Sequence, residues 1–204
     1  MSQRRFSAAH TRAMALDERA RLRATLGGLA AHQWAAPSLC AGWTVRDVAG
    51  HLAENTRASL PSFLGGMARA RFDHDEYNRR TARAWSRLSD SELLAAFETD
   101  RIMTVFRLNP TLLLVDYVVH HQDICRPLGL DAGTPPEHLL ATLRALATSS
   151  MFAAETREAA GMRIAATDLD FSHGTGPSEL RGPAAYLVAR VAGRDTGSAR
   201  PDPG

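Results

Sequence analysis

Apolar residues recur along most of the chain at the three- and four-residue spacing that is typical of amphipathic helices. The pattern is interrupted by clusters of Gly, Pro and polar residues, which are typical of loops. We expect six long helices in this part of the chain, at about 11–33, 44–63, 72–88, 89–103, 110–126 and 135–158. Helices of this length and number predict a mainly α fold.

Three helix starts carry capping signals. Thr44 is followed three residues later by Asp47, and Ser89 is followed three residues later by Glu92, which is the capping-box spacing. Asn109 precedes a proline, a pair that suits an N-cap and a first helical position. Gly65 and Gly66 are expected to interrupt the helix that begins at Thr44.

The pattern changes near residue 160. Residues 162–167 alternate like a strand, and a second short strand near 179–181 is expected to complete a hairpin. A last short helix is expected at 184–191. We therefore divide the chain into a helical domain (1–160), a small α+β segment (161–192) and a polar tail (193–204) that we expect to be disordered.

Composition excludes little but sets the class of protein. The chain has 204 residues, 45% hydrophobic and 23% charged, which is ordinary for a soluble globular protein. A net charge of +2 gives no electrostatic case for a nucleic-acid partner. All basic residues are Arg, which indicates the coding bias of a GC-rich genome such as that of an actinobacterium.

Location and redox state follow from the same sequence. No apolar run reaches the roughly 18 residues of a membrane span, and the first ten residues lack the apolar core of a secretory signal. We expect a cytoplasmic protein without a membrane partner. Cys40 and Cys125 fit no CxxC pattern and are expected to be reduced, structural thiols.

The candidate chemistry lies in the helix predicted at 110–126. Asp116 and His120 are four residues apart, so they project from the same face of that helix. With His51 from the helix predicted at 44–63, they make a set of ligands that suits Zn²⁺ and also Ni²⁺, Co²⁺ or Fe²⁺. The alternative is a polar pair packed inside the bundle and satisfied by hydrogen bonds. The spacing alone leaves both interpretations open.

Neighbouring residues allow further roles. His121 projects about 100° from His120 and is expected to be partly exposed or to support the metal ligands, rather than to bind the metal itself. Asp123 is close enough to orient the His120 imidazole, or else makes a loop contact. Arg126 either binds a carboxylate of a cofactor or supplies favourable charge at a helix C-terminus. His138 is expected at the surface.

Three segments resemble a known family. They are Trp34–Leu52 (WAAPSLCAGWTVRDVAGHL), His120–Gly129 (HHQDICRPLG) and Ala166–Gly174 followed by Arg181–Ala184 (ATDLDFSHG and RGPA). Together they look like the signatures of the mycothiol-dependent maleylpyruvate isomerase-like proteins, an actinobacterial branch of the DinB-like superfamily. The resemblance implies a DinB-like four-helix bundle with a short α+β C-terminal appendage.

The resemblance also implies chemistry. It implies a divalent metal held by His51, Asp116 and His120, and a small-molecule thiol cofactor, mycothiol, with Arg126 as a possible contact. A bound metal lowers the pKa of a thiol and holds it as the nucleophilic thiolate. The implied activity is isomerisation or S-transfer on a small electrophilic substrate. Better-known members carry Glu where this chain has Asp116, and the shorter side chain either alters the metal, admits a bridging water or abolishes binding.

Two other classes of function remain open from the sequence. One is a non-catalytic protein of the same fold that binds a metal or small molecule. The other is an interaction protein whose ancestral site has decayed. A homodimer is compatible with each of these functions, although no sequence feature specifies it.

Overall fold

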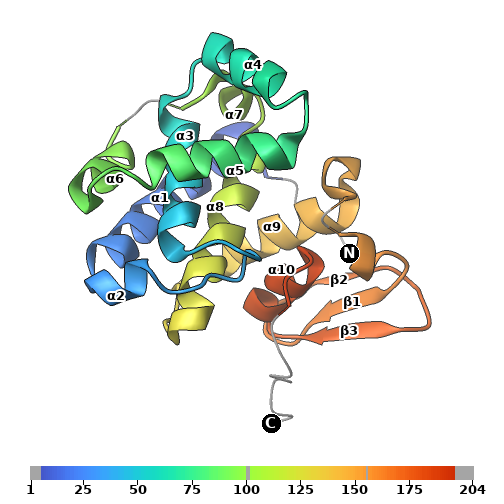
Figure 1. Ribbon diagram of the computed structural model, residues 1–204. Helices are drawn as coiled ribbons and strands as arrows, with labels where there is room; N and C mark the ends of the chain where they lie inside the picture. Colours follow the sequence, from blue (N-terminus) through green and yellow to red (C-terminus); the bar gives the residue numbers. More distant parts are fainter. Residues whose placement is uncertain (1–5, 100–101, 155, 196–204) are drawn as a thin grey trace.

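The structure is a computed structural model that describes residues 6–99, 102–154 and 156–195. It is mainly helical, with a small sheet near the C-terminus (Figure 1). The helices are α1 (Ala8–Gly27), α2 (Ala31–Trp34), α3 (Val45–Arg57), α4 (Leu60–Arg69), α5 (His74–Trp85), α6 (Asp90–Ala96), α7 (Thr104–Leu108), α8 (Pro110–Cys125), α9 (Pro136–Thr148) and α10 (Ala184–Val191). Short 3₁₀ turns are η1 (Arg126–Leu128), η2 (Ser150–Phe152) and η3 (Arg157–Ala159).

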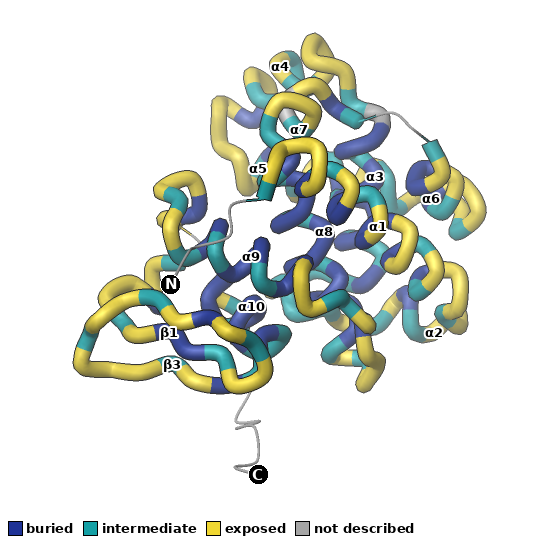
Figure 2. The backbone as a smooth tube through the Cα atoms, turned by 180° about the vertical axis from the view of Figure 1, so that it is seen from behind, coloured by how far each residue is buried: buried dark blue, intermediate teal, exposed yellow. Residues whose placement is uncertain are grey.

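Helix α8 forms the centre of the core. It is apolar on nearly every side, and Leu113, Tyr117, Val118 and Ile124 are almost completely buried. Helix α1 packs most extensively against α8, α3 and α9 also pack against α8, and α5 packs against α3. Figure 2 shows α8 buried behind helices whose outer faces are exposed. This burial places the polar residues of α8 in a largely dry environment.

Two of the three predicted caps are formed. The Thr44 hydroxyl accepts the Asp47 backbone N–H at 3.2 Å, and the Asp47 carboxylate accepts the Thr44 backbone N–H at 3.0 Å. Ser89 and Glu92 make the same reciprocal pair. Asn109 makes no side-chain capping bond, so the start of α8 depends on Pro110 at its first position.

The helix predicted at 44–63 is divided at a different place. It ends at Arg57, and α4 begins after Ser59, whose hydroxyl accepts the Ser62 backbone N–H. Pro61 suits the first turn of α4 because its missing N–H has no partner to lose there. Gly65 and Gly66, predicted as the break, lie inside α4. The helix predicted at 135–158 likewise ends earlier, at Thr148, and continues as 3₁₀ turns.

The predicted hairpin is wrong. The sheet has the order β2-β1-β3, with β1 (Arg163–Ala166) in the centre, β2 (Ser172–His173) antiparallel to it and β3 (Glu179–Gly182) parallel to it. The chain crosses from one side of β1 to the other through a glycine-rich loop. A Cβ on Gly176 would lie 1.7 Å from the Gly161 carbonyl oxygen, so the crossing requires glycine. The two strands of the predicted hairpin, β1 and β3, do pair, but in parallel, because β2 reverses the chain direction between them.

The mainly helical fold with an α+β appendage is confirmed. Among the described residues, no helix is both long and apolar enough to span a bilayer. Most of the tail predicted to be disordered, residues 196–204, lies outside the described residues. Residues 193–195 of that tail are described, and they return to the bundle.

Candidate metal centre

The structure brings His51, Asp116 and His120 together. His51 projects from α3, and Asp116 and His120 project from the adjacent face of α8. One oxygen of Asp116, Oδ1, lies 3.5 Å from His51 Nε2 and 3.5 Å from His120 Nε2. One ligand atom from each residue lies within 4.8 Å of the other two. Three donor atoms of the kinds that bind transition metals therefore face one another.

The spacing of these atoms fits a metal ion. Ligand atoms about 2.1 Å from a tetrahedral metal lie about 3.4 Å from one another. The two nitrogen-to-oxygen separations of 3.5 Å match that edge length. They are also long for a direct hydrogen bond. The three side chains are thus spaced for binding a divalent ion with an open coordination position rather than for hydrogen bonding to one another.

The environment of Asp116 keeps it ionised. Its other oxygen, Oδ2, accepts a hydrogen bond from the side-chain amide of Asn55, one turn after His51 on α3. Burial by itself would raise the pKa of Asp116, but interactions with His51, His120 and Asn55 outweigh burial and lower it. Asn55 thereby fixes one oxygen and leaves Oδ1 directed at the two imidazoles.

His120 is held by a second carboxylate. Its Nδ1 lies 2.8 Å from Asp123 Oδ2, and an ionised carboxylate only accepts, so Nδ1 carries the hydrogen. In a neutral ring the lone pair is then on Nε2, the atom that faces Asp116. Such a carboxylate–histidine pair is common behind metal ligands because it sets the tautomer and the ring orientation.

Asp123 is itself enclosed by donors. Arg194 binds it through Nε and Nη2 at 3.0–3.1 Å, and the Cys40 thiol donates to Oδ2 at 3.1 Å. Burial would raise the pKa of Asp123, but the hydrogen bond from His120 and the charges of His120 and Arg194 bring it to about 2. Burial and the neighbouring Asp123 charge raise the pKa of Cys40, so this thiol stays protonated and acts as a donor.

A second group with metal-ligand atoms, formed by Cys40, His120 and Asp123, overlaps the first at His120. The Arg194 guanidinium already supplies a positive charge to this group, and the Asp123 oxygens accept from Arg194, Cys40 and His120. The site that remains open to a metal is the one at Asp116.

Access to the candidate centre is narrow. The His51 and His120 side chains are each 13% exposed and that of Asp116 is 20% exposed. The Trp43 ring packs edge-on against the His51 ring, with centroids 5.6 Å apart, and the rings of His51 and His120 are 5.1 Å apart. Trp43, which ends the loop before α3, therefore forms one wall of the entrance.

The residue beside His120 faces the opposite side of α8. His121 is completely buried, and its Nδ1 lies 2.8 Å from Glu18 Oε1. His138 is also buried and lies 2.8 Å from Glu18 Oε2. The expectation that His138 lies at the surface is wrong, and His121 is not partly exposed, because the buried Glu18 on α1 contacts both imidazoles.

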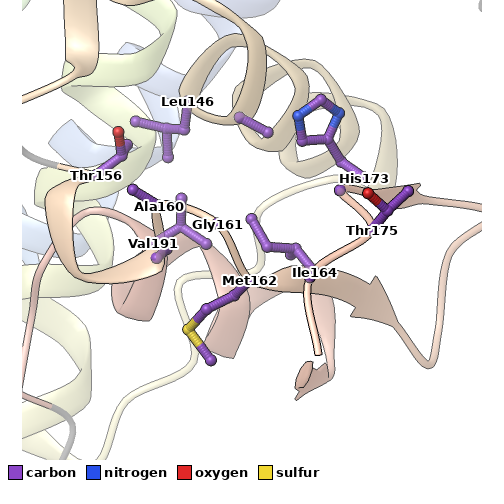
Figure 3. Close-up of a pocket in the computed structure, with 13 residues that line it drawn as sticks. Leu146, Thr156, Ala160, Gly161, Met162, Ile164, His173, Thr175 and Val191 are labelled. Atoms are coloured by element: carbon purple, nitrogen blue, oxygen red, sulfur yellow. The ribbon is translucent and has the colours of Figure 1, made fainter. Parts of the chain in front are cut away.

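Two other features lie apart from the three clustered side chains. Arg126 begins η1, and its Nε donates to Gln122 Oε1 at 3.4 Å. A pocket of about 400 Å³ lies between α9, β1 and α10 (Figure 3), at the α+β segment of residues 161–192, which we call the C-terminal module. Apolar Leu146, Ile164 and Val191 line it together with His173, and none of the residues of the candidate metal centre does.

Comparison with known proteins shows what this chain is similar to. Residues 15–109, just under half of the chain, match the family model described as the mycothiol maleylpyruvate isomerase N-terminal domain. This part of the chain therefore resembles that N-terminal domain, and the match does not extend over the whole chain. The match to this domain includes His51 and ends just before α8, which carries the other two clustered residues.

Solved structures show a similar fold over nearly the whole chain. A crystal structure of the mycothiol-dependent maleylpyruvate isomerase is 14% identical with a TM-score of 0.60, and one of a mutant of it is 15% identical with a TM-score of 0.61. Each comparison covers 94% of this chain and 91% of the other. At this identity the likeness shows a shared fold. None of the curated proteins matches the sequence significantly.

Sequence reasoning missed three residues of the candidate metal centre. Asn55 is four residues after His51, so helical spacing alone could have placed it on the same face. Cys40 was expected to be a structural thiol, and no spacing indicated its contact with Asp123. Arg194 lies in a Gly-rich segment without periodicity, and only the fold brings it to Asp123.

Proposed function

We propose that this protein binds one divalent metal through His51, Asp116 and His120 and uses it with a small-molecule thiol. The observation that supports this proposal is the position of Asp116 Oδ1, 3.5 Å from the Nε2 atoms of both histidines. Two imidazoles and one carboxylate suit Zn²⁺ first and also Ni²⁺, Co²⁺ or Fe²⁺. A metal bound there would lower the pKa of a coordinated thiol and stabilise the thiolate.

The chain's own residues fit that task. One carboxylate and two neutral imidazoles would leave a divalent ion with a net positive charge, because Asp123 is neutralised by Arg194. An anionic ligand such as a thiolate completes this charge balance. Trp43 and the low exposure of the three side chains limit water at the site. No cysteine of the chain supplies the thiolate at this position, since Cys40 donates to Asp123.

The match to the mycothiol maleylpyruvate isomerase N-terminal domain supports mycothiol as the thiol that we propose. The reaction class that follows is isomerisation or S-transfer, in which a thiolate attacks a small electrophilic substrate. Arg126 is proposed as a contact for a carboxylate of the thiol or substrate, because its described partner is a neutral amide and its guanidinium suits planar anions.

Metal analysis tests the proposal directly. Protein prepared without chelator and equilibrated with Zn²⁺ is expected to retain one metal per chain by elemental analysis. The variants His51→Ala and His120→Ala are expected to retain almost none, whereas His32→Ala, which changes an exposed histidine, retains it fully. Equal metal content in the wild-type protein and both site variants would refute the proposed ligands.

A thermal-shift series combined with a turnover assay distinguishes an enzyme from a protein that only binds the thiol. Mycothiol is expected to raise the melting temperature of the Zn²⁺-loaded protein by mass action, and to do so less in Arg126→Ala. If the protein converts an electrophile such as maleylpyruvate in the presence of mycothiol, it is an enzyme. A mycothiol-dependent shift without turnover of any electrophile tested favours a non-catalytic binding protein of the same fold.

A further inference from the structure

Arg194 connects the last part of the described chain to the candidate metal centre. It follows α10 by three residues, and its guanidinium reaches Asp123 on α8, 71 positions earlier. The contact is bidentate, with Nε 3.0 Å from Oδ1 and Nη2 3.0 Å from Oδ2. The Asp123 side chain is fully buried, so this pair is shielded from water far better than a surface ion pair.

Arg194 is fixed on its own side as well. Its backbone N–H donates to the Ala189 carbonyl at 2.9 Å, and its carbonyl accepts from Arg190 Nη1 at 3.1 Å. Its Nη1 donates to the Ala192 carbonyl at 3.1 Å. The guanidinium is therefore held in one orientation before it meets Asp123, which reduces the entropy lost in the contact.

The contact continues to the candidate metal ligand. Asp123 Oδ2, which accepts from Arg194, also accepts from His120 Nδ1 at 2.8 Å. Without Arg194, Asp123 would be a fully buried carboxylate with only the imidazole and the Cys40 thiol as side-chain donors. A buried charge that loses its counter-ion shifts, takes up a proton or admits water. Any of these changes weakens the acceptor that sets the orientation of His120.

We propose that Arg194 is a positioning residue for the metal centre: by holding Asp123 it fixes the tautomer and direction of His120, so the segment after α10 completes a site that lies in the bundle. The inference rests on the proposed metal function. Arg194 does not touch the three ligand atoms itself, and its effect passes through Asp123.

The test measures Zn²⁺ affinity by competition with a chromophoric chelator, well below the melting temperature of each variant. Arg194→Gln is expected to bind Zn²⁺ about 10–100-fold more weakly, which is the usual effect of losing an outer partner of a metal ligand. Arg194→Lys keeps the charge without the fork and is expected to recover part of the affinity. Arg163→Gln, which breaks an exposed pair with Glu179 in the same module, is the matched control and should match wild type.

Nitrogen-detected NMR of the metal-free protein gives a second readout. In the wild type, His120 is expected as the Nδ1–H tautomer, and in Arg194→Gln as a mixture. Unchanged affinity and an unchanged tautomer in Arg194→Gln would overturn the inference while leaving the proposed metal function intact. If the wild type binds no metal, the metal function fails, and the tautomer alone decides whether Arg194 positions His120. If Arg194→Gln does not fold, Arg194→Lys is compared by the same two measurements.

Discussion

At the scale of single residues, two carboxylates on α8 have different tasks. Asp116 directs one oxygen at two imidazoles and has room for a cation, whereas Asp123 has its oxygens occupied by donors. The difference arises from Arg194, which lies beside Asp123. A third carboxylate, Glu18, is buried between His121 and His138 and takes part in neither arrangement.

Replacing Asp116 by Asn tests its charge with little change in shape. Asn lacks the negative charge that offsets the metal, so Zn²⁺ affinity is expected to fall by at least about 100-fold, more than for the loss of an outer partner. Asp170→Asn, at an exposed position in the C-terminal module, is the control and should bind as wild type does. Retention of wild-type affinity in Asp116→Asn would remove Asp116 from the ligand set.

Replacing Glu18 by Gln tests the buried network. The Gln amide offers one acceptor oxygen and turns a donor toward the other histidine, so unfolding at pH 7 is expected to cost about 3 kcal/mol less. The control is Glu98→Gln, which removes an exposed ion pair with Arg23, a residue of α1 like Glu18. Its free energy of unfolding should stay within about 0.5 kcal/mol of the wild-type value. Chemical denaturation measures both.

The same network makes stability depend on pH. Burial would raise the pKa of Glu18, but hydrogen bonds from His121, His138 and Thr134 lower it from 4.5 to about 2. The unfolded chain therefore binds a proton more readily than the folded chain between these values. The stabilisation from Glu18 is complete above about pH 4.5 and is lost as the pH falls toward 2. Denaturation at pH 7 and pH 3 should show the gap between wild type and Glu18→Gln narrowing at pH 3.

At the scale of elements, the position of α3 decides where His51 points. The capping box at Thr44 begins this helix, and Gly50 allows α5 to approach its back. A Cβ on Gly50 would lie 2.8 Å from the Ala82 carbonyl oxygen and 3.0 Å from the Ser86 backbone nitrogen. These are backbone atoms of the α5 region, so they cannot move away as a flexible side chain would.

Two glycine substitutions test this packing. Gly50→Ala is expected to destabilise the protein by about 1–3 kcal/mol, because it forces α3 and α5 apart. Gly65→Ala is the control: it lies within α4, with no backbone atom near its added Cβ, and should stabilise by about 0.5–1 kcal/mol through helix propensity. Urea denaturation that gives both variants the same change would contradict the role of Gly50.

At the scale of the whole molecule, burial is greatest in α8 and least in peripheral helices such as α4. Twelve residues of α8 are buried, whereas α4 has no buried residue and exposes Leu60 and Leu64. Buried backbone that opens only with global unfolding exchanges its amide hydrogens slowly, and weakly packed helices exchange fast. The exposed leucines of α4 are compatible with a homodimer, which no sequence feature specifies.

Hydrogen exchange measured by mass spectrometry tests this distribution. Peptides from α8 are expected to be the slowest to exchange, and peptides from residues 60–69 among the fastest. Zn²⁺ is expected to slow exchange in residues 45–57 and 110–125, which carry the proposed ligands, and to leave 60–69 unchanged. Protection spread evenly over the chain, or confined to the sheet, would contradict the proposed location.

Helical periodicity and local capping predicted much of this arrangement. They located α8 and α10 closely, and the four-residue spacing placed Asp116 and His120 on one face because that relation depends only on the helix. The strand order and the break between α3 and α4 were missed, since they depend on the Gly176 crossing and on packing outside the local sequence. The contact of Arg194 with Asp123 joins residues 71 positions apart and has no local signal.

The adjacent histidines of α8 have a consequence for how that helix is rotated about its axis. His121 is locked to Glu18 on α1, and its neighbour His120 projects about 100° away toward α3. The buried carboxylate on one side thus sets the angle of the helix, and with it the aim of the imidazole on the other side. Loss of the contact between Glu18 and His121 would therefore rotate α8 and change the direction of the His120 side chain, although Glu18 itself lies outside the candidate centre.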